Sequence, residues 1–132
     1  MSTHAATLPT PIGELLLVSD GTGLIALEFD DDRRGAPTPG GDGDPVIRAA
    51  ALQLREYFAG ARTTFDVPLR PAGTPFERRV WDALREIPYG ETTSYGALAA
   101  RIGEPVAARA VGRANGRNPL PVIVPCHRVI GA

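Results

Sequence analysis

Apolar residues near the N-terminus fall into two short runs. Within residues 3–29 these runs are Leu15–Val18 and Leu24–Phe29, and the sequence SDGTG separates them. Two apolar runs joined by a Gly-containing turn are typical of a β-hairpin. We therefore predict strands in residues 3–29. Residues 30–44, DDDRRGAPTPGGDGD, have no apolar periodicity, and this Gly, Pro and Asp content predicts a mobile loop.

A helical pattern follows this loop. Asp44 and Pro45 suit the N-cap and first position of a helix, and Gly60 suits its end. The apolar residues that recur between them at helical spacing are Ile47, Ala51, Leu54 and Phe58. Residues 63–73 read as a short extended piece and a linker. Residues 1–70 are thus expected to form a small first domain of strands and one helix.

The second half predicts several short helices. Residues 74–77, TPFE, form a capping-box sequence, and Pro88 is expected to stop the helix that it starts. The buried stripe of that helix is predicted to be Phe76, Val80, Leu84 and Ile87. Ser94 is a candidate cap for a helix ending at Ile102, and Pro105 is expected to start the next one. Short helices joined by a Gly-containing turn suggest a helix-turn-helix, although helical bundles share the pattern.

The predicted helix after Pro105 has two kinds of face. Its apolar face consists of Val106, Ala110 and Ala114. Its basic row consists of Arg109, Arg113 and Arg117. Its small residues are Ala107, Ala108 and Gly112. A slim basic helix suits close approach to a DNA backbone or groove, whereas a solvated charged surface gives the same pattern, so both interpretations stay open at this point.

Composition narrows the class of protein. The 132 residues include one Cys and two His, no apolar run long enough to span a bilayer, and no secretory signal at the start. One cysteine makes no internal disulfide, and so few ligands disfavour a zinc site. We expect a cytoplasmic protein. Residues 1–72 carry six Arg and ten acidic residues, whereas residues 73–132 carry eight Arg and five, so the second half alone is basic and suited to nucleic acid.

The single thiol belongs to Cys126, in the sequence PVIVPCHRVIGA at residues 121–132. The prolines that precede it, Pro119, Pro121 and Pro125, predict a rigid, extended segment from which the thiol emerges. His127 is a candidate base for a reactive thiolate, and Asn118 is a candidate turn-forming side chain. Taken one at a time, these residues are also well explained as a small buried hydrophobe, a structural histidine and a turn residue.

In combination with the preceding helices, the thiol segment resembles a known family. FERRVWDALREIPYGETTSYGALAARIG, ARAVGRANGRNP and LPVIVPCHRVIGA are similar, in order, to the O6-alkylguanine-DNA alkyltransferases, and PCHRV resembles their active-site signature. The resemblance covers residues 74–132 strongly and residues 1–73 only in architecture. It implies an α+β protein, with a ribonuclease H-like sheet-and-helix domain at 1–70 and a winged helix-turn-helix-like domain at 71–132.

The resemblance also implies roles for individual residues. Cys126 would accept the alkyl group permanently, and His127 would take the thiol proton through a water. Tyr95 would donate a hydrogen bond to the base, Arg109 would fill the space of the extruded nucleotide, and Asn118 would brace the turn. The residues implied to face DNA are Ser94, Tyr95, Ala107, Ala108, Arg109, Gly112 and Arg113.

The implied reaction is stoichiometric repair of O6-alkylguanine, and of O4-alkylthymine, in double-stranded DNA by a monomer. A thioether has no easy hydrolytic exit, so each molecule would act once, without metal or organic cofactor. The N-terminal cysteines with which some members bind zinc are absent. The family's chain normally continues past RVIGA, with a loop, a helix and an acidic partner for the histidine. We therefore expect weak or no activity from these 132 residues.

Two other functions remain as alternatives. A damage-binding protein without transfer activity would use the same helices, although the presence of Cys126 argues against it. A cysteine hydrolase would use Cys126 and His127 without DNA, and the helix-turn-helix argues against it. Substitution of Arg109 separates the hypotheses, because only the DNA-dependent reaction should suffer.

Overall fold

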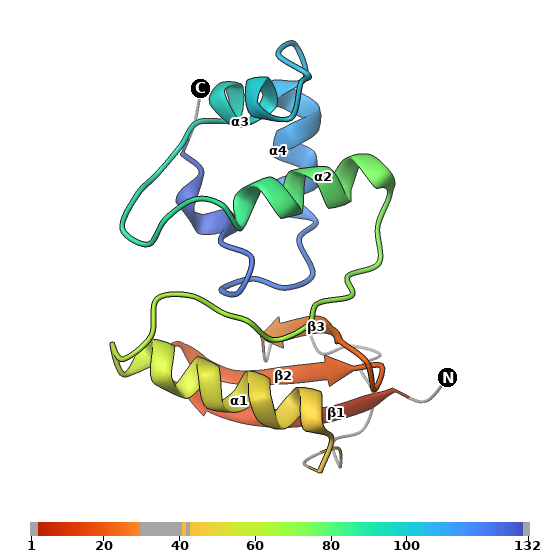
Figure 1. The fold of residues 1–132 in the computed structure, drawn as a ribbon, viewed down its shortest axis with the longest axis vertical. Coiled ribbons are helices and arrows are strands. Elements are labelled where there is room, and N and C mark those ends of the chain that lie inside the picture. The colour runs from red at the N-terminus through yellow and green to blue at the C-terminus, as the bar shows by residue number, and fades with distance from the viewer. Residues whose placement is uncertain (1–2, 30–40, 42, 131–132) are drawn as a thin grey trace. The chain divides into compact units, whose positions relative to one another are not determined.

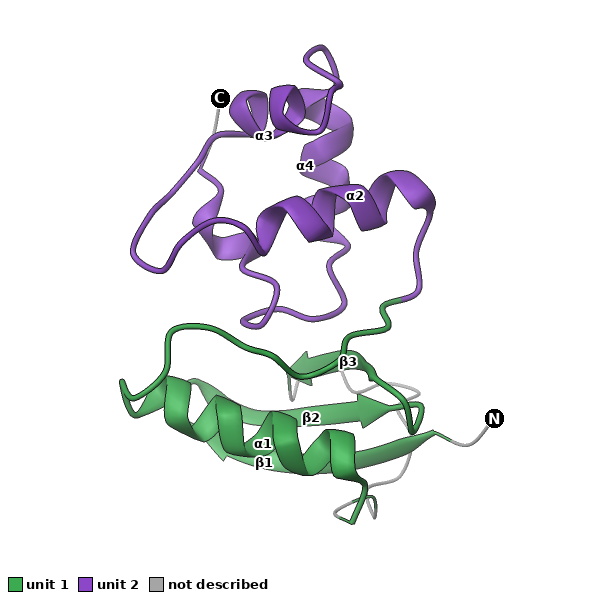
Figure 2. Ribbon diagram, in the orientation of Figure 1, with its two compact units in different colours: residues 1–71 green, residues 72–132 purple. Residues whose placement is uncertain are grey.

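The computed structural model describes residues 3–29, 41 and 43–130, and the predicted loop at 30–44 lies largely outside them. The chain forms two compact units, residues 1–71 and 72–132, as coloured in Figure 2. The first combines a sheet with a helix and the second is mainly helical, which confirms the α+β class. No helix in the described part of the chain is long and apolar enough to cross a membrane.

A three-stranded antiparallel sheet with the order β1-β2-β3 forms the first unit, and Figure 1 shows α1 lying along it. The bounds are β1 His4–Thr10, β2 Gly13–Ser19, β3 Leu24–Phe29 and α1 Pro45–Phe58. Leu8 pairs with Leu15 across β1 and β2, and Leu17 pairs with Leu27 across β2 and β3. All four of these leucines are buried. The strands expected in residues 3–29 are thus confirmed, and the central strand β2 is buried continuously from Leu15 to Ser19.

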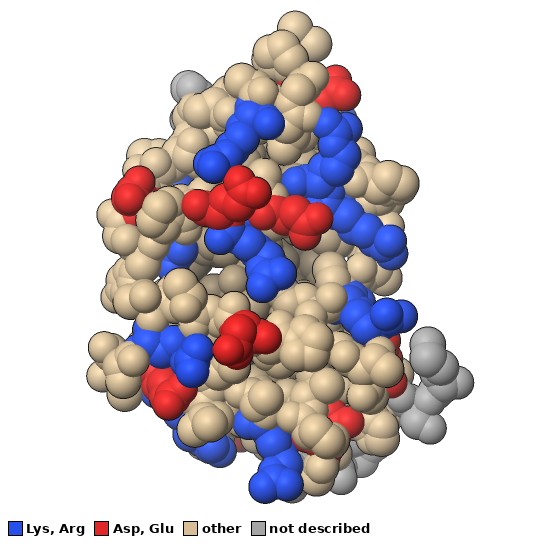
Figure 3. Space-filling model, viewed as in Figure 1, with Lys and Arg blue, Asp and Glu red and all other residues tan. Residues whose placement is uncertain are grey.

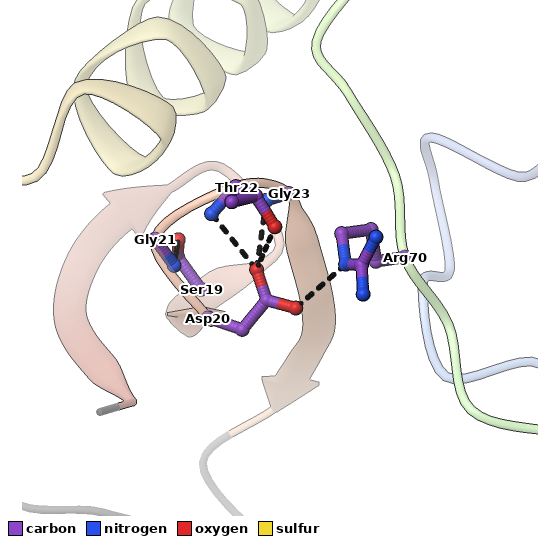
Figure 4. A network of polar contacts seen from close by, with 6 residues as sticks. All are labelled: Ser19, Asp20, Gly21, Thr22, Gly23 and Arg70. Carbon is purple, nitrogen blue, oxygen red and sulfur yellow. Dashed lines mark hydrogen bonds and ion pairs between the residues drawn. The ribbon is translucent and has the colours of Figure 1, made fainter. Parts of the chain in front are cut away.

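The turn between β2 and β3 is held by Asp20 (Figure 4). Its Oδ1 accepts hydrogen bonds from the backbone N–H groups of Thr22 and Gly23, each at 2.9 Å, and from the Thr22 hydroxyl at 2.8 Å. Its Oδ2 accepts from Nε of Arg70 at 2.8 Å. These bonds, the Thr22 N–H first and then Arg70, hold the pKa of Asp20 well below its usual value. The predicted hairpin turn is confirmed, and Asp20 also ties it to the end of the unit.

Helix α1 begins where the sequence predicted. Asp44 is its N-cap and accepts from the Ile47 N–H at 3.0 Å, and Gly60 follows its end with φ +78°. The predicted apolar stripe is only partly right, because Ala51 and Phe58 are half-buried. The fully buried positions are Val46, Ile47, Ala50, Gln53 and Leu54. The face that meets the sheet is therefore centred one residue N-terminal to the predicted one.

Helix α2 (Pro75–Leu84) opens the second unit with the predicted capping box. Thr74 Oγ1 accepts from the Glu77 N–H at 3.1 Å, and the Glu77 carboxylate accepts from the Thr74 N–H at 2.9 Å. The helix ends at Leu84, four residues before the Pro88 that was expected to stop it, because the chain turns through Ile87 N–H, which donates to the Leu84 carbonyl at 3.1 Å.

Helices α3 (Tyr95–Arg101) and α4 (Ala108–Gly116) form the helix-turn-helix. Ser94 caps α3 as predicted, with its hydroxyl accepting from Ala97 N–H at 3.1 Å. The predicted start of α4 at Pro105 is wrong. The N-cap of α4 is Ala107, and its N–H donates to the Glu104 carbonyl at 2.9 Å, which closes a separate turn before the helix.

This later start changes the apolar face of α4. Val106 was expected on that face, but it lies in the turn and is 97% exposed. The buried residues of the helix are Val111 and Ala114. The residues on the opposite side of the helix, Arg109 and Arg113, are exposed, as the pattern predicted.

The proline-rich segment after α4 was expected to be extended and instead folds as consecutive turns. Val124 N–H donates to the Leu120 carbonyl at 2.9 Å, which pulls the chain into a loop. Val122 has φ +76°, a left-handed conformation that is costly for a β-branched residue. The burial expected here is confirmed for Ile123 and Val124, so packing against the unit's core holds the loop.

Candidate active site

Cys126 is half-buried in a short 3₁₀ turn, Cys126–Arg128, which we call the thiol turn. The turn is anchored to the chain that leads into α3. Thr93 N–H donates to the Arg128 carbonyl at 2.9 Å, and Ile130 N–H donates to the Thr93 carbonyl at 2.8 Å. These bonds hold the thiol turn beside the start of α3.

A second anchor is the side chain of Arg128. Its Nη1 donates to the Ile87 carbonyl at 2.7 Å, beyond the end of α2, and its guanidinium lies 5.6 Å from the centre of the Tyr89 ring. Arg128 thus gives the Ile87 carbonyl a hydrogen-bond donor while it holds the thiol turn.

Asn118 connects the end of α4 to the same region. Its Oδ1 accepts from the Leu120 N–H at 2.9 Å, the Asx turn expected before Pro119, and its Nδ2 donates to the Val124 carbonyl at 2.8 Å. Asn115, which was not singled out from the sequence, donates through Nδ2 to the Cys126 carbonyl at 3.4 Å. Both asparagines therefore reach from α4 to the backbone around Pro125.

His127 follows Cys126 in the thiol turn and is exposed. Successive residues of a 3₁₀ helix are about 120° apart, so adjacency does not bring the imidazole and the thiol into direct contact. Partial loss of water around the imidazole, and then the charge of Arg128, lower the pKa of His127 below its usual value. The imidazole is therefore neutral at pH 7 and able to accept a proton.

Tyr95 lies at the first position of α3, against α4. A Cβ built on Gly112 would lie 3.8 Å from Cε1 of the Tyr95 ring, an ordinary van der Waals contact. The Tyr95 side chain is half-buried, and so is Ser94 beside it. Both candidates thus lie at the N-terminus of α3, two residues or fewer from the Thr93 strand pairing that anchors the thiol turn.

The charged side chains of this unit are mixed in sign. Arg117, the last of the predicted basic row, lies 3.5 Å from a Glu77 oxygen, and Arg101 lies 3.1 Å from Glu86. Figure 3 shows acidic side chains lying between basic ones on the face it presents. Arg109 and Arg113 on α4 are exposed, and Ala107 and Ala108 are half-buried beside them. This exposed arginine pair on a slim helix is the part of the unit suited to phosphate or groove contact.

Trp81 supports α4 from inside the unit. Its side chain is 3% exposed, and Nε1 donates to the Ala114 carbonyl at 2.8 Å. Within the part of the chain that the structure describes, no three His, Cys, Asp or Glu side chains come together as a metal site. The chemical group that stands out in this unit is the anchored thiol of Cys126 next to a helix-turn-helix.

The sequence did not predict three residues around the thiol: Asn115, Val122 and the Arg128 anchor. Asn115 had only a weak signal, an amide side chain in the last turn of the predicted helix and close in sequence to Asn118. Neither a left-handed valine nor a guanidinium bound to the Ile87 carbonyl has a local sequence signature.

A sheet-and-helix unit followed by a helix-turn-helix unit that carries an anchored cysteine favours the class of DNA-binding proteins. Residues 3–71 match the model of the 6-O-methylguanine DNA methyltransferase, ribonuclease-like domain, and residues 75–132 match that of the same family's DNA binding domain. The chain belongs to the 6-O-methylguanine DNA methyltransferase family.

Similar proteins agree with this assignment. The methylated-DNA–protein-cysteine methyltransferase of Methanosarcina acetivorans is 50% identical over 131 residues, which cover 98% of this chain and 84% of that protein. The Mycobacterium tuberculosis O6-methylguanine methyltransferase structure superposes with a TM-score of 0.90 at 50% identity, over 99% of this chain and 80% of that one. A structure of Mycobacterium tuberculosis OGT in complex with DNA superposes with a TM-score of 0.86 at 52% identity, over 98% and 79%.

Proposed function

We propose that this chain repairs DNA by moving the alkyl group from O6 of guanine to the sulfur of its own Cys126. The observation that supports this most strongly is the location of its only cysteine. Cys126 lies in a turn tied to both helices of a DNA-binding unit, through Thr93 before α3 and through Asn115 in the last turn of α4. A thiol required only for packing would not need that connection.

The reaction is a displacement at the alkyl carbon. The Cys126 thiolate forms an S–C bond while the C–O6 bond breaks, and the electron pair leaves with the guanine. His127, neutral at pH 7, accepts the thiol proton through a water, which its position about 120° around the turn requires. The thioether product has no hydrolytic exit, so each molecule reacts once.

The reactive base must leave the duplex to reach a thiol on a rigid turn. Extrusion costs a few kcal/mol, and less for a poorly paired lesion, which favours damaged sites. Arg109, exposed on α4, fills the vacated space, and Arg113 and Ser94 contact phosphates. Ala107, Ala108 and Gly112 let the helix lie deep in the groove. Tyr95 donates a hydrogen bond to the extruded base and eases the charge on the leaving guanine.

The partner is duplex DNA that contains O6-alkylguanine, and one monomer acts at each lesion. Because DNA is the substrate, the protein acts in the compartment that holds the genome, which in prokaryotic relatives is the cytoplasm.

A single-turnover experiment tests the proposed function. The purified chain is mixed with a duplex that carries one O6-methylguanine, and the loss of methylated base is followed with Cys126→Ala as the control. We expect the amount of restored guanine to rise, even if the reaction is slow, and to level off at no more than one guanine per protein molecule. Cys126→Ala should restore none. Restoration beyond one per molecule, or equal restoration by Cys126→Ala, would contradict the proposal. Arg109→Ala should slow the reaction with DNA without unfolding the unit.

A further inference from the structure

The backbone around the thiol is held from one side by two amides at the end of α4. Asn118 Nδ2 donates to the Val124 carbonyl at 2.8 Å, and Asn115 Nδ2 donates to the Cys126 carbonyl at 3.4 Å. Val124 and Cys126 flank Pro125, so one asparagine is bound on each side of this proline. Asn115 lies in the last turn of α4 and Asn118 follows the helix end, and both side chains donate to this one segment.

The second bond is the weaker one and the more informative. The Cys126 carbonyl has one other donor, the Val129 N–H, which is also 3.4 Å away. The Val124 carbonyl, in contrast, accepts from Asn118 and from the Cys126 N–H, both at 2.8 Å. The Cys126 carbonyl is therefore bound less firmly than the Val124 carbonyl, and Asn115 donates one of its two hydrogen bonds.

Asn115 also carries a destabilising feature. Its Oδ1 is buried and has no hydrogen-bond partner among the described residues. A buried unpaired acceptor destabilises a protein, and a leucine of similar size would avoid the penalty. Packing alone therefore does not account for an asparagine at this place, whereas donation to Cys126 does.

The loop that these two bonds close, between the end of α4 and Pro125, is strained. Val122 has φ +76°, which the chain sustains only where its surroundings hold it. Its neighbours Leu120, Ile123 and Val124 are buried, which fixes the loop on its inner side. The side chains of Asn115 and Asn118 fix the end of the loop that carries the thiol.

We propose that Asn115 is a positioning residue for alkyl transfer: its amide holds the Cys126 carbonyl, so that the thiol points at the alkyl carbon of the extruded base. The proposal rests on the proposed function. Asn115 acts through Cys126 and not through the DNA, so its loss slows the transfer step and leaves DNA affinity unchanged.

The test compares Asn115→Leu with the wild type and with Gly116→Ala. Gly116 is the next residue of α4, and a Cβ built there meets nothing within 4 Å, so this variant changes the same helix end without touching the thiol turn. At saturating methylated duplex we expect Asn115→Leu to transfer about 3- to 10-fold more slowly, the worth of one hydrogen bond, with the Kd for DNA unchanged. A rate equal to that of Gly116→Ala, or a Kd that rises in step with the slower rate, would overturn the proposal.

Asn115→Asp gives a readout that a structural role would not change. An ionised carboxylate cannot donate to the Cys126 carbonyl, whereas a protonated one can. We expect its transfer rate, relative to the wild type at each pH, to rise as the pH falls into the carboxyl range. A pH-independent ratio would count against the proposal. This variant also keeps the size of asparagine, which protects the test if Asn115→Leu folds poorly.

A DNA-independent arm separates this inference from the proposed function. Hydrogen exchange of the Val129 amide, which shares the Cys126 carbonyl, reports on the thiol turn directly. If the Val129 amide exchanges faster than in the wild type in Asn115→Leu but not in Gly116→Ala, Asn115 holds the thiol turn. Equal exchange rates in Asn115→Leu and the wild type would refute this role. If the wild type transfers no methyl group, the proposed function fails, and the exchange result still decides whether Asn115 holds the turn.

Discussion

Replacing Asn118 with alanine removes both hydrogen bonds that shape the loop before the thiol. The Leu120 N–H loses an acceptor at 2.9 Å and the Val124 carbonyl loses a donor at 2.8 Å. Leu120 is 0% exposed and Val124 is 2% exposed, so water does not readily replace the lost partners. A stranded buried group costs about 1–3 kcal/mol, and the Val124 carbonyl keeps its bond from the Cys126 N–H, so we expect a loss of about 2–4 kcal/mol.

Urea unfolding followed by the fluorescence of Trp81 measures this loss in the second unit. Trp81 is the only tryptophan and is 3% exposed, so its signal reports on the unit that holds the loop. Arg117→Ala is the matched control, because Arg117 precedes Asn118 in the chain, its own side chain is 70% exposed and its ion pair with Glu77 is worth about 0–1 kcal/mol. If Asn118→Ala were as stable as Arg117→Ala, the two bonds would not hold the loop and the reasoning would be refuted.

Three further predictions concern single residues. Gly112→Ala should raise the free energy of unfolding by about 0.5–1 kcal/mol, because glycine is costly inside a helix and the built Cβ meets nothing closer than 3.8 Å. The added methyl group should weaken DNA affinity in a binding titration, and unchanged affinity would argue against close approach of α4 to DNA. Gly103→Ala should lower stability by about 1 kcal/mol in urea because φ is +82°, and an equally stable variant would contradict this. The lowered pKa of His127 means that the unfolded chain binds a proton more readily, so stability should fall as the pH drops below 6.5 towards the folded pKa. His127→Gln should flatten that slope, and an unchanged slope would place its origin elsewhere.

Local signals explain which parts of the fold could be predicted. The SDGTG turn, the Asp44 cap, the Thr74 capping box and the Ser94 cap each satisfy backbone groups only a few residues away, so their chemistry is legible in the sequence. The start of α4 was predicted wrongly because a local signal, Pro105, was misleading. Pro105 suits a first helical position, but the N-cap of α4 is Ala107, and the helix begins at Ala108.

The region of the thiol depends on contacts between distant residues, which local patterns do not carry. Three prolines predicted an extended chain between Asn118 and Cys126, but the Val124 hydrogen bond to Leu120 and burial of Ile123 fold it into turns. The bond from Arg128 to the Ile87 carbonyl spans 41 residues. Cys126, His127 and Asn118 were singled out from residue type and local pattern, which could be read because they lie close together in the chain. Their roles, and those of Tyr95 and Arg109, stay proposals.

The most direct test of the account is to locate the transferred group. After reaction with duplex DNA carrying O6-methylguanine, the protein is digested and its peptides are sequenced by tandem mass spectrometry. The account predicts one methyl group, on Cys126 and on no other residue. A methyl group on another residue, or a folded protein that still carries none after an incubation long enough for slow transfer, would contradict the claim that this thiol is the acceptor.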